Sequence, residues 1–349
     1  MSTLKRMFRK TAMATLATAF SLNAFAASSA INGNVRVVIG SSSTGGDTYQ
    51  AASMISEALS EKLDVRFKVD AVGVSAAFTA LDRSRNDSTI MIFHDHAYLG
   101  KLYKQRGFKD IFDNYVVGQT FAVNPGNAFL VAKKSPYHSL QDVIDAAGNG
   151  TTIKVAIQPG GVSEIGYSAI KNAIKLQYPG KEENFQAFNT GSQSDKNQTM
   201  FDGLTDLISG SVQANEQYTR LGEDDQKSMR FVWLTAREKI VNQANPEGIG
   251  ETDRDALMAF VEPTVSVAMN KTQNFTFDKE FFFIYNKKTN PEVIAAIDTA
   301  LGEIFAEGKI QTEMKKSFFI PNFLPAEASR AHLKEKNDQY KTVIDAIRK

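Results

Sequence analysis

The sequence contains no cysteine among its 349 residues. It can therefore form no disulfide and no thiolate metal site, and no lipid anchor can be attached to a cysteine near its start. A fold of this length must be held by its hydrophobic core alone. Hydrophobic residues make up 42% of the chain, which is enough for such a core, and the length suggests two domains.

Net charge is also nearly absent, because 40 lysines and arginines stand against 39 acidic residues. A surface of this kind gives no electrostatic reason to bind nucleic acid or an anionic membrane. After residue 26 the chain has no apolar stretch that approaches the roughly 18 residues a transmembrane helix needs. We therefore expect the processed chain to be soluble and without a nucleic-acid partner, and we expect a monomer.

The first 26 residues have the pattern of a signal peptide. Four cations and no acid occupy residues 1–10, and a short apolar segment of small residues follows. Ala24, Phe25 and Ala26 then match the small-x-small pattern of a cleavage site. This order predicts export to the periplasm with cleavage near Ala26. An uncleaved amphipathic helix or a membrane anchor is the alternative reading of the same segment.

Sequence motifs of nucleotide binding and of catalysis are absent as well. No strand end carries GxGxxG with a following acid or GxxxxGK[ST], and neither GxSxG nor HExxH occurs. We predict no cofactor and no catalytic residue. An exported enzyme that acts on a small organic acid stays the alternative, because catalytic triads assemble in space and not along the sequence.

The sequence does contain a repeated order of apolar strand, polar turn and helix. Strands at 35–40, 65–72 and 88–95 alternate with helices, and the order restarts with a strand at 127–136. Such alternation predicts parallel sheets covered by helices. Long helices with apolar stripes close the chain. We predict an α/β fold of two doubly wound lobes with a ligand cleft between them. Lobe one comprises residues 27–127 and 240–349, and lobe two comprises residues 128–239.

Four of the predicted strands end in turns of the same composition. They read "SSSTGGD" at 41–47, "VGVSAA" at 72–77, "QPGGVSE" at 158–164 and "NTGSQS" at 189–194. Each turn leads into a helix, whose N-terminus presents free N–H groups and a partial positive charge. Glycine lets this backbone approach a ligand closely, and serine and threonine add hydroxyl donors.

Capping alone would explain one such turn. Four of them at the carboxyl ends of strands predict a shared site for an anion in the cleft. The predicted ligand-binding residues are Ser43, Thr44, Gly45, Gly46, Asp47, Gly73, Ser75, Gly160, Gly161, Ser163, Asn189, Thr190 and Gly191. No arginine is among them, so we expect backbone amides, hydroxyls and bridging waters to hold the ligand.

Other polar residues allow more than one reading. Asp47 is either a structural cap at the start of a helix or a partner for an ammonium group of the ligand. His94 and His96 are either a cleft wall, a surface pair or two ligands of a metal, although zinc needs three or four ligands. We predict no metal site. Trp233 lies in an apolar strand and is expected in the core, and His332 is expected on the surface.

With these turns aligned, the chain resembles the substrate-binding receptors of tripartite tricarboxylate transporters, also called Bug receptors. The match runs through Gly45, Gly46 and Asp47 in the first turn and through "KSPYHSLQDVIDAAG" at 134–148. It continues through "GGVSEIG" at 160–166, "FDGLTDLISG" at 201–210 and the helices at 290–305 and 324–344. The resemblance covers nearly the whole processed chain.

This resemblance implies a fold like that of type II periplasmic binding proteins. It also implies capture of a small organic acid and its delivery to the permease subunits of a membrane transporter. Val162 and Gly166 depart from the family's pattern, as do Gln50 and Ala51, where an Ala-Arg pair is common. The stretch "STGGDTYQAA" is also similar to receptors of TAXI-type TRAP transporters, which would have the same fold and the same task.

Overall fold

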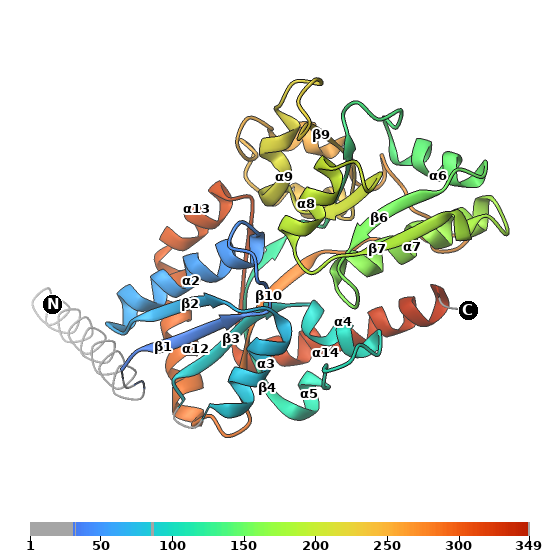
Figure 1. The fold of residues 1–349 in the computed structure, drawn as a ribbon. Coiled ribbons are helices and arrows are strands. Elements are labelled where there is room, and N and C mark those ends of the chain that lie inside the picture. The colour runs from blue at the N-terminus through green and yellow to red at the C-terminus, as the bar shows by residue number, and fades with distance from the viewer. Residues whose placement is uncertain (1–30, 32, 85–86, 348–349) are drawn as a thin grey trace, which may run out of the picture.

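The computed structural model describes residue 31 and residues 33–84 and 87–347. The predicted signal peptide lies outside the described residues. The described chain forms two β-sheets, each with helices packed on both faces, and the two sheets form two lobes (Figure 1). No helix in the described ranges is long and apolar enough to cross a membrane.

The sheet of the first lobe has six strands in the order β11-β4-β10-β3-β1-β2. Strand β1 pairs in parallel with β2 and β3, whereas β10 pairs antiparallel with β3 and β4, and β11 antiparallel with β4. The strands are β1 Val35–Ile39, β2 Phe67–Ala71, β3 Thr89–His94, β4 Tyr115–Asn124, β10 Lys279–Asn286 and β11 Ile320–Leu324.

The sheet of the second lobe has five strands in the order β7-β6-β8-β5-β9. Strand β6 pairs in parallel with β7 and β8, and β5 pairs antiparallel with β8 and β9. The strands are β5 Ala128–Ala132, β6 Ile153–Ile157, β7 Phe185–Asn189, β8 Leu207–Gly210 and β9 Met229–Leu234.

Both sheets are therefore mixed, where the sequence predicts parallel sheets. Strands β5 and β10 run against β6 and β3 of their sheets because each arrives from the opposite lobe, whereas β11 is antiparallel but follows α13 within the first lobe. Strand β4 leads out of the first sheet into β5, and β10 returns to the first sheet after the second is complete. A strand that arrives from the opposite lobe enters the sheet in the opposite direction. Strands β4 and β11 have no counterpart among the strands predicted from the sequence.

Apolar stripes explain the positions of the helices that cover the first sheet. Ala51, Ile55 and Leu59 of α2 (Asp47–Leu63) pack in one cluster with Ile297 and Leu301 of α12 (Pro291–Glu307). On the opposite face lie α3 (Val74–Arg83), α4 (His96–Leu102), α5 (Ile111–Asn114) and α14 (Ala326–Ile347). Helix α13 (Lys309–Lys316) packs beside α2 and α12.

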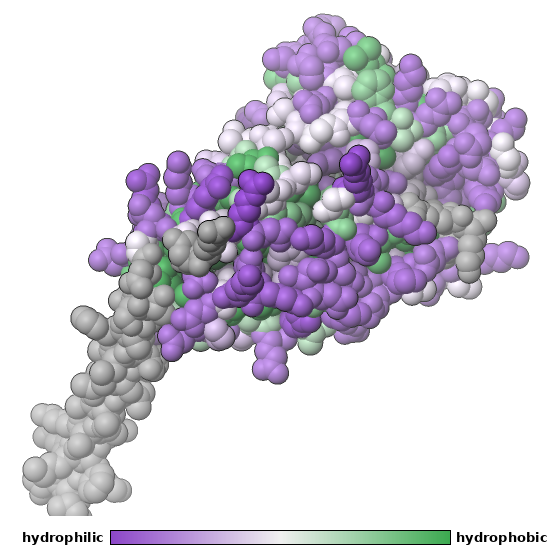
Figure 2. Space-filling model, turned by 60° about the horizontal axis from the view of Figure 1, so that its bottom comes forward, coloured by the Kyte–Doolittle hydropathy of each residue, from purple (hydrophilic) through white to green (hydrophobic). Residues whose placement is uncertain are grey.

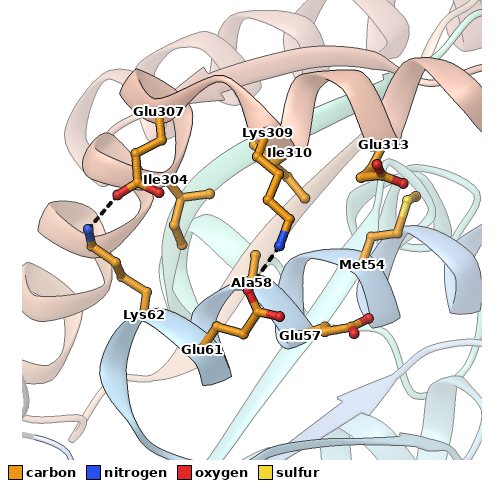
Figure 3. Close-up of a pocket in the computed structure, with 10 residues that line it drawn as sticks. All are labelled: Met54, Glu57, Ala58, Glu61, Lys62, Ile304, Glu307, Lys309, Ile310 and Glu313. Carbon is orange, nitrogen blue, oxygen red and sulfur yellow. Dashed lines mark hydrogen bonds and ion pairs between the residues drawn. The ribbon is translucent and has the colours of Figure 1, made fainter.

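Ion pairs on the surface tie α2 to α12 and α13. A groove of about 450 Å³ runs between these helices, with Ile304 and Ile310 among its apolar lining. Lys62 pairs with Glu307 at 2.8 Å, and Lys309 pairs with Glu61 at 3.2 Å, so both pairs bridge the groove (Figure 3). This groove lies on the outer side of the first lobe.

The second sheet is covered by seven further helical segments. They are α6 Leu140–Gly148, α7 Val162–Gln177, the 3-10 helix η1 Glu182–Asn184, α8 Gln193–Phe201, α9 Val212–Thr219, α10 Glu238–Val241 and α11 Arg254–Met258. Trp233 is buried and stacks on Phe129, so its expected place in the core is confirmed. On the face shown in Figure 2, most residues are hydrophilic and apolar residues form small scattered patches.

The chain crosses between the lobes after β4 and again between β9 and β10, and these two crossing segments contact each other. Thr235 accepts a hydrogen bond from the backbone of Asn127 at its hydroxyl (2.8 Å) and donates that hydroxyl to the carbonyl of Phe277 (2.7 Å). Gly126 has φ +89°, and a side chain there would collide with the backbone of Ala236. Glycine is therefore required where the crossing strands approach each other.

The predicted lobe boundaries at residues 127 and 240 stay a prediction. Residues 241–261 bear on the second boundary, because Val241, Leu257 and Val261 pack in one cluster with Phe231 and Leu234 of β9. The chain joins the first sheet again at β10. Helix α14 finally contacts both β4 and α7, so it spans the two lobes.

Candidate functional site

A cavity of about 60 Å³ lies between the two sheets, where turns from both lobes meet. A space of this size holds only a few water-sized groups, so the lobes lie close together across it. The first lobe and the crossing segments contribute Gly40, Ser41, Gly46, Asp47, Thr48, Phe93, His94, His96, Asn127 and Lys279. The second lobe contributes Gln158, Val162, Ser163, Gly191, Ser192, Gln193, Lys196, Ser209, Gly210 and Ser211.

Asp47 lies at the first position of α2 and is buried. Its carboxylate forms an ion pair with the ammonium group of Lys279, the first residue of β10, which is buried as well. Asn124, at the end of β4, donates its side-chain amide to the same Oδ2 atom at 2.5 Å. The neighbouring Thr48 donates its hydroxyl to Oδ1 at 3.4 Å. The carboxylate is thus held inside the protein, and it does not cap the helix by a side-chain bond.

His94 ends β3 and His96 begins α4, and both are buried. Burial lowers the pKa of both imidazoles, and the positive charge of Lys279 adds to this, so that the pKa of His96 falls to about 3. Both rings are therefore neutral near pH 7. The backbone N–H of His96 donates to Nδ1 of His94 at 3.3 Å, and Nε2 of His96 is buried without a hydrogen-bond partner.

The two histidines form part of the cleft wall, which is one of the readings that the sequence allows. In the described part of the chain, no group of three or more His, Cys, Asp or Glu residues could hold a metal ion. The His94 and His96 rings lie 6.2 Å apart between their centroids.

Lys196 projects from α8 into the cavity from the second lobe. The residue is only 7% exposed. Among the described residues its ammonium group has neither an ion pair nor a hydrogen bond. Burial and, to a smaller extent, the charge of Lys279 lower its pKa to about 7, although Asp47 acts in the opposite direction. A buried cation without a partner is costly, so this position favours an anion beside it.

The starts of α7, α8 and α9 line the same cavity as this lysine, and the first two follow turns singled out from the sequence. Ser192 caps α8 by accepting the N–H of Asp195 at 3.1 Å, and Ser211 caps α9 by accepting the N–H of Ala214 at 3.2 Å. Helix α7 begins after Gly161, and the hydroxyl of Ser163 accepts the backbone N–H of Gln158 at 2.8 Å. Their dipoles add positive potential to that of Lys196.

The structure places the predicted residues at different distances from this cavity. Gly46, Asp47, Ser163 and Gly191 line it. Ser43 lies beside it, and its hydroxyl is 3.2 Å from that of Ser194 on the opposite lobe. The residues that do not line the cavity are Thr44, Gly45, Gly73, Ser75, Gly160, Gly161, Asn189 and Thr190.

Two of the eight predicted residues that do not line the cavity have structural roles beside it. A side chain at Gly160 would overlap that of Gln105 in the first lobe, so this turn packs across the lobe boundary. Thr190 donates its hydroxyl to the carbonyl of Ile157 at 2.9 Å. That any of the thirteen residues contacts a ligand stays a prediction.

Several residues that line the cavity are not among those predicted from the turns. Lys196 and Lys279 are the most consequential, because they bring two amines into a site where backbone amides, hydroxyls and waters are expected to hold the ligand. The sequence gives a weak indication that Lys279 belongs to the site, since it is the charged first residue of a largely apolar strand. Lys196 lies in the polar stretch "QSDKNQTM", where nothing marks it as buried.

His332 is exposed on α14, so its expected surface position is confirmed. Its Nε2 lies 2.8 Å from Oε2 of Glu280, which is buried in β10. The hydrogen bond to Glu280 raises the pKa of the imidazole, although burial opposes it.

No family model matches the sequence, and no curated protein has a significant match to it. Solved structures of the same fold are periplasmic binding proteins. One is R. palustris Rpa4515 with adipate, with a TM-score of 0.72, 14% identity, and coverage of 90% of this chain and 97% of that one. Another is the periplasmic binding protein BugD, with a TM-score of 0.69 and 15% identity over 91% and 98% of the two chains.

A third is MatC from Rhodopseudomonas palustris with bound malate, with a TM-score of 0.64 and 13% identity over 90% and 100% of the two chains. At these identities the similarity establishes the fold. The predicted architecture of two α/β lobes, like that of type II periplasmic binding proteins, is confirmed, and the structural neighbours include Bug and TctC proteins.

Proposed function

We propose that this chain is a periplasmic solute-binding receptor that captures a small organic carboxylate between its two lobes. It delivers the ligand to the permease subunits of a tripartite tricarboxylate-type transporter, and it catalyses no reaction. The fold supports this proposal, since the neighbours of the same fold are binding proteins and two of them contain adipate or malate. The export pattern of residues 1–26 agrees with a periplasmic location.

The single observation that carries the proposal is the ammonium group of Lys196, unpaired among the described residues, on a buried residue that lines the cavity between the lobes. A carboxylate placed there would supply the missing counter-ion. Hydrogen bonds between a charged donor and a carboxylate are about twice as strong as neutral ones. The capped N-termini of α8 and α9 and the start of α7 add donors of the predicted kind.

Closure of the lobes would complete the site. Among the described residues, the hydrogen bond between the first turn and α8 is a single pair of hydroxyls, Ser43 and Ser194, and such a bond is weak enough to open. In the open state the ligand would enter, and in the closed state Lys196 and the first-lobe wall would surround it. This cycle is ordinary for ligands bound between two hinged lobes.

Thermal-shift screening of the processed protein against mono-, di- and tricarboxylates tests the proposal. A ligand at a hundred times its dissociation constant should stabilise the protein by about 2.7 kcal/mol. Calorimetry should then show that Lys196→Met weakens binding by about 2–5 kcal/mol, because the ligand carboxylate loses its partner. The exposed Lys181, in the same lobe, provides the matched control Lys181→Met, which should leave affinity unchanged.

Two results would contradict the proposal. One is a complete absence of carboxylate binding by a protein that melts cooperatively. The other is product formation from any ligand, followed by mass spectrometry, which would favour the exported enzyme instead. Equal affinity of wild-type and Lys196→Met protein would show that the buried lysine is not the ligand's partner.

A further inference from the structure

The described residues that line the cavity offer no free carboxylate to a cation. Among the described residues that line it, Asp47 alone has a carboxylate. Its Oδ2 atom is shared by the ammonium group of Lys279 and the amide of Asn124, and its Oδ1 atom accepts the hydroxyl of Thr48. Lys279 and Asp47 therefore cancel each other, and Lys196, when protonated, gives the cavity one positive charge.

We propose that Lys279, by occupying Asp47, makes this receptor select carboxylates that lack an ammonium group and reject the corresponding amino acids. The inference rests on the proposed function and specifies its ligand class. A carboxylate without an amine matches the single positive charge of the cavity. An amino acid would also bring an ammonium group near Lys196 and Lys279, where the only carboxylate of the described lining residues is already paired.

The remaining polar groups of the wall bring no negative charge. His94 and His96 have none, and the serine, asparagine and glutamine groups that line the cavity are neutral, including Asn127, whose Oδ1 atom is buried without a hydrogen-bond partner among the described residues. The nearby acids are engaged elsewhere, since Glu164 binds the backbone N–H of Gly160 and Asp195 binds the backbone N–H of Gly191 at 3.2 Å. Juxtaposed like charges cost several kcal/mol, so the discrimination should reach at least about 100-fold.

Calorimetry with matched pairs tests this selectivity. The probes are propionate and L-alanine, succinate and L-aspartate, glutarate and L-glutamate, together with the tightest carboxylate of the screen and its 2-amino derivative. The wild-type protein should prefer the carboxylate of a bound pair by at least about 100-fold. In Lys279→Met, Asp47 becomes free to accept an ammonium group, so the preference should shrink by about tenfold or more.

The double variant Asp47→Asn/Lys279→Met is the control for this shift. It removes both charges and keeps Lys196, so it should bind carboxylates without any gain for amino acids. It also avoids the unpaired buried carboxylate that could destabilise Lys279→Met. If Lys279→Met does not fold, a wild-type preference of 100-fold together with an unchanged preference in the double variant supports the proposal.

A wild-type preference below about 100-fold overturns the inference. So does a folded Lys279→Met protein with an unchanged preference, or a double variant that gains affinity for amino acids. Failure of the proposed function has a different signature, because then no carboxylate of any pair or of the wider screen binds. Binding of amino acids alone would overturn the selectivity and leave capture of a small acid standing.

Discussion

Lys196 combines burial, a missing counter-ion and a strongly lowered pKa in one side chain. A lysine at the surface stays protonated far above neutral pH, whereas burial brings the pKa of Lys196 down to about 7. The charged or titratable groups that face the same cavity are Asp47, Lys279, His94 and His96. The lowered pKa values of both histidines keep them neutral above pH 7, so Lys196 is the base whose charge changes there.

Carboxylate affinity should therefore depend on pH in a defined direction. Because the anion favours the protonated amine, affinity should be highest below pH 7 and fall as pH rises through about 7. The limiting slope is about tenfold per pH unit, since one proton is then taken up with each ligand. Calorimetry between pH 6 and 9.5 in two buffers of different ionisation enthalpy measures both the slope and the proton uptake.

The variant Lys196→Arg provides the control for this dependence. An arginine stays charged across the whole range, so any binding that it retains should vary little with pH. A flat profile in the wild-type protein would show that Lys196 does not exchange a proton on binding.

Helix α14 is attached to the first sheet by a cluster of buried charged groups. Its Lys336 lies 2.7 Å from Asp95, which follows β3, and 3.3 Å from Glu280 of β10, and it donates to the carbonyl of Asp278 at 2.9 Å. Asp95 also accepts the backbone N–H of Glu280 at 2.6 Å. Burial by itself lowers the pKa of Lys336, but the two carboxylates outweigh it and hold the amine protonated.

Loss of this lysine should destabilise the whole fold. Lys336→Met leaves Asp95 and Glu280 buried without their main counter-ion, which costs about 3–5 kcal/mol of the free energy of unfolding. Urea unfolding followed by circular dichroism measures this cost. On the same helix, Lys334 pairs with Asp338 at 2.8 Å in an exposed i, i+4 pair. Lys334→Met should therefore change stability by no more than about 0.5 kcal/mol. Similar losses in the two variants would contradict a structural role for the buried cluster.

At the scale of the molecule, the arrangement depends on two crossing segments and one long helix. The crossings meet at Gly126 and Thr235, and α14 lies against both lobes. The cavity between the lobes is small, and the hydroxyls of Ser43 and Ser194 touch across it. These features describe a closed arrangement, and rotation about the crossings would open it.

Ligand binding should shift the molecule toward this closed arrangement. The absence of cysteine allows two spin labels to be placed without removing any native thiol. Labels at the exposed positions of Glu57→Cys and Gln198→Cys lie on opposite lobes, and their distance should shorten and narrow when a bound carboxylate saturates the protein. A pair within the first lobe, Glu57→Cys and Lys287→Cys, should not respond. If the distance between the labels on opposite lobes does not change when ligand saturates the protein, closure is contradicted.

Local sequence determined much of this protein. Apolar runs such as 35–39 and 153–157 became strands, and stripes such as Ile297, Leu301 and Ile304 became the buried faces of helices. Glycine- and serine-rich turns were recognised as helix starts, and several of them line the cavity. These features depend on neighbours within a few residues, so they can be read from one chain.

Tertiary structure alone decided the direction of the crossing strands and the charge of the cleft. Asp47 and Lys279 are 232 positions apart and meet only because β10 returns beside the end of β4. Lys196 is an ordinary lysine in a polar helix until the first lobe covers it. Burial and pairing of a charge depend on what the rest of the chain places around it, and no local pattern records that.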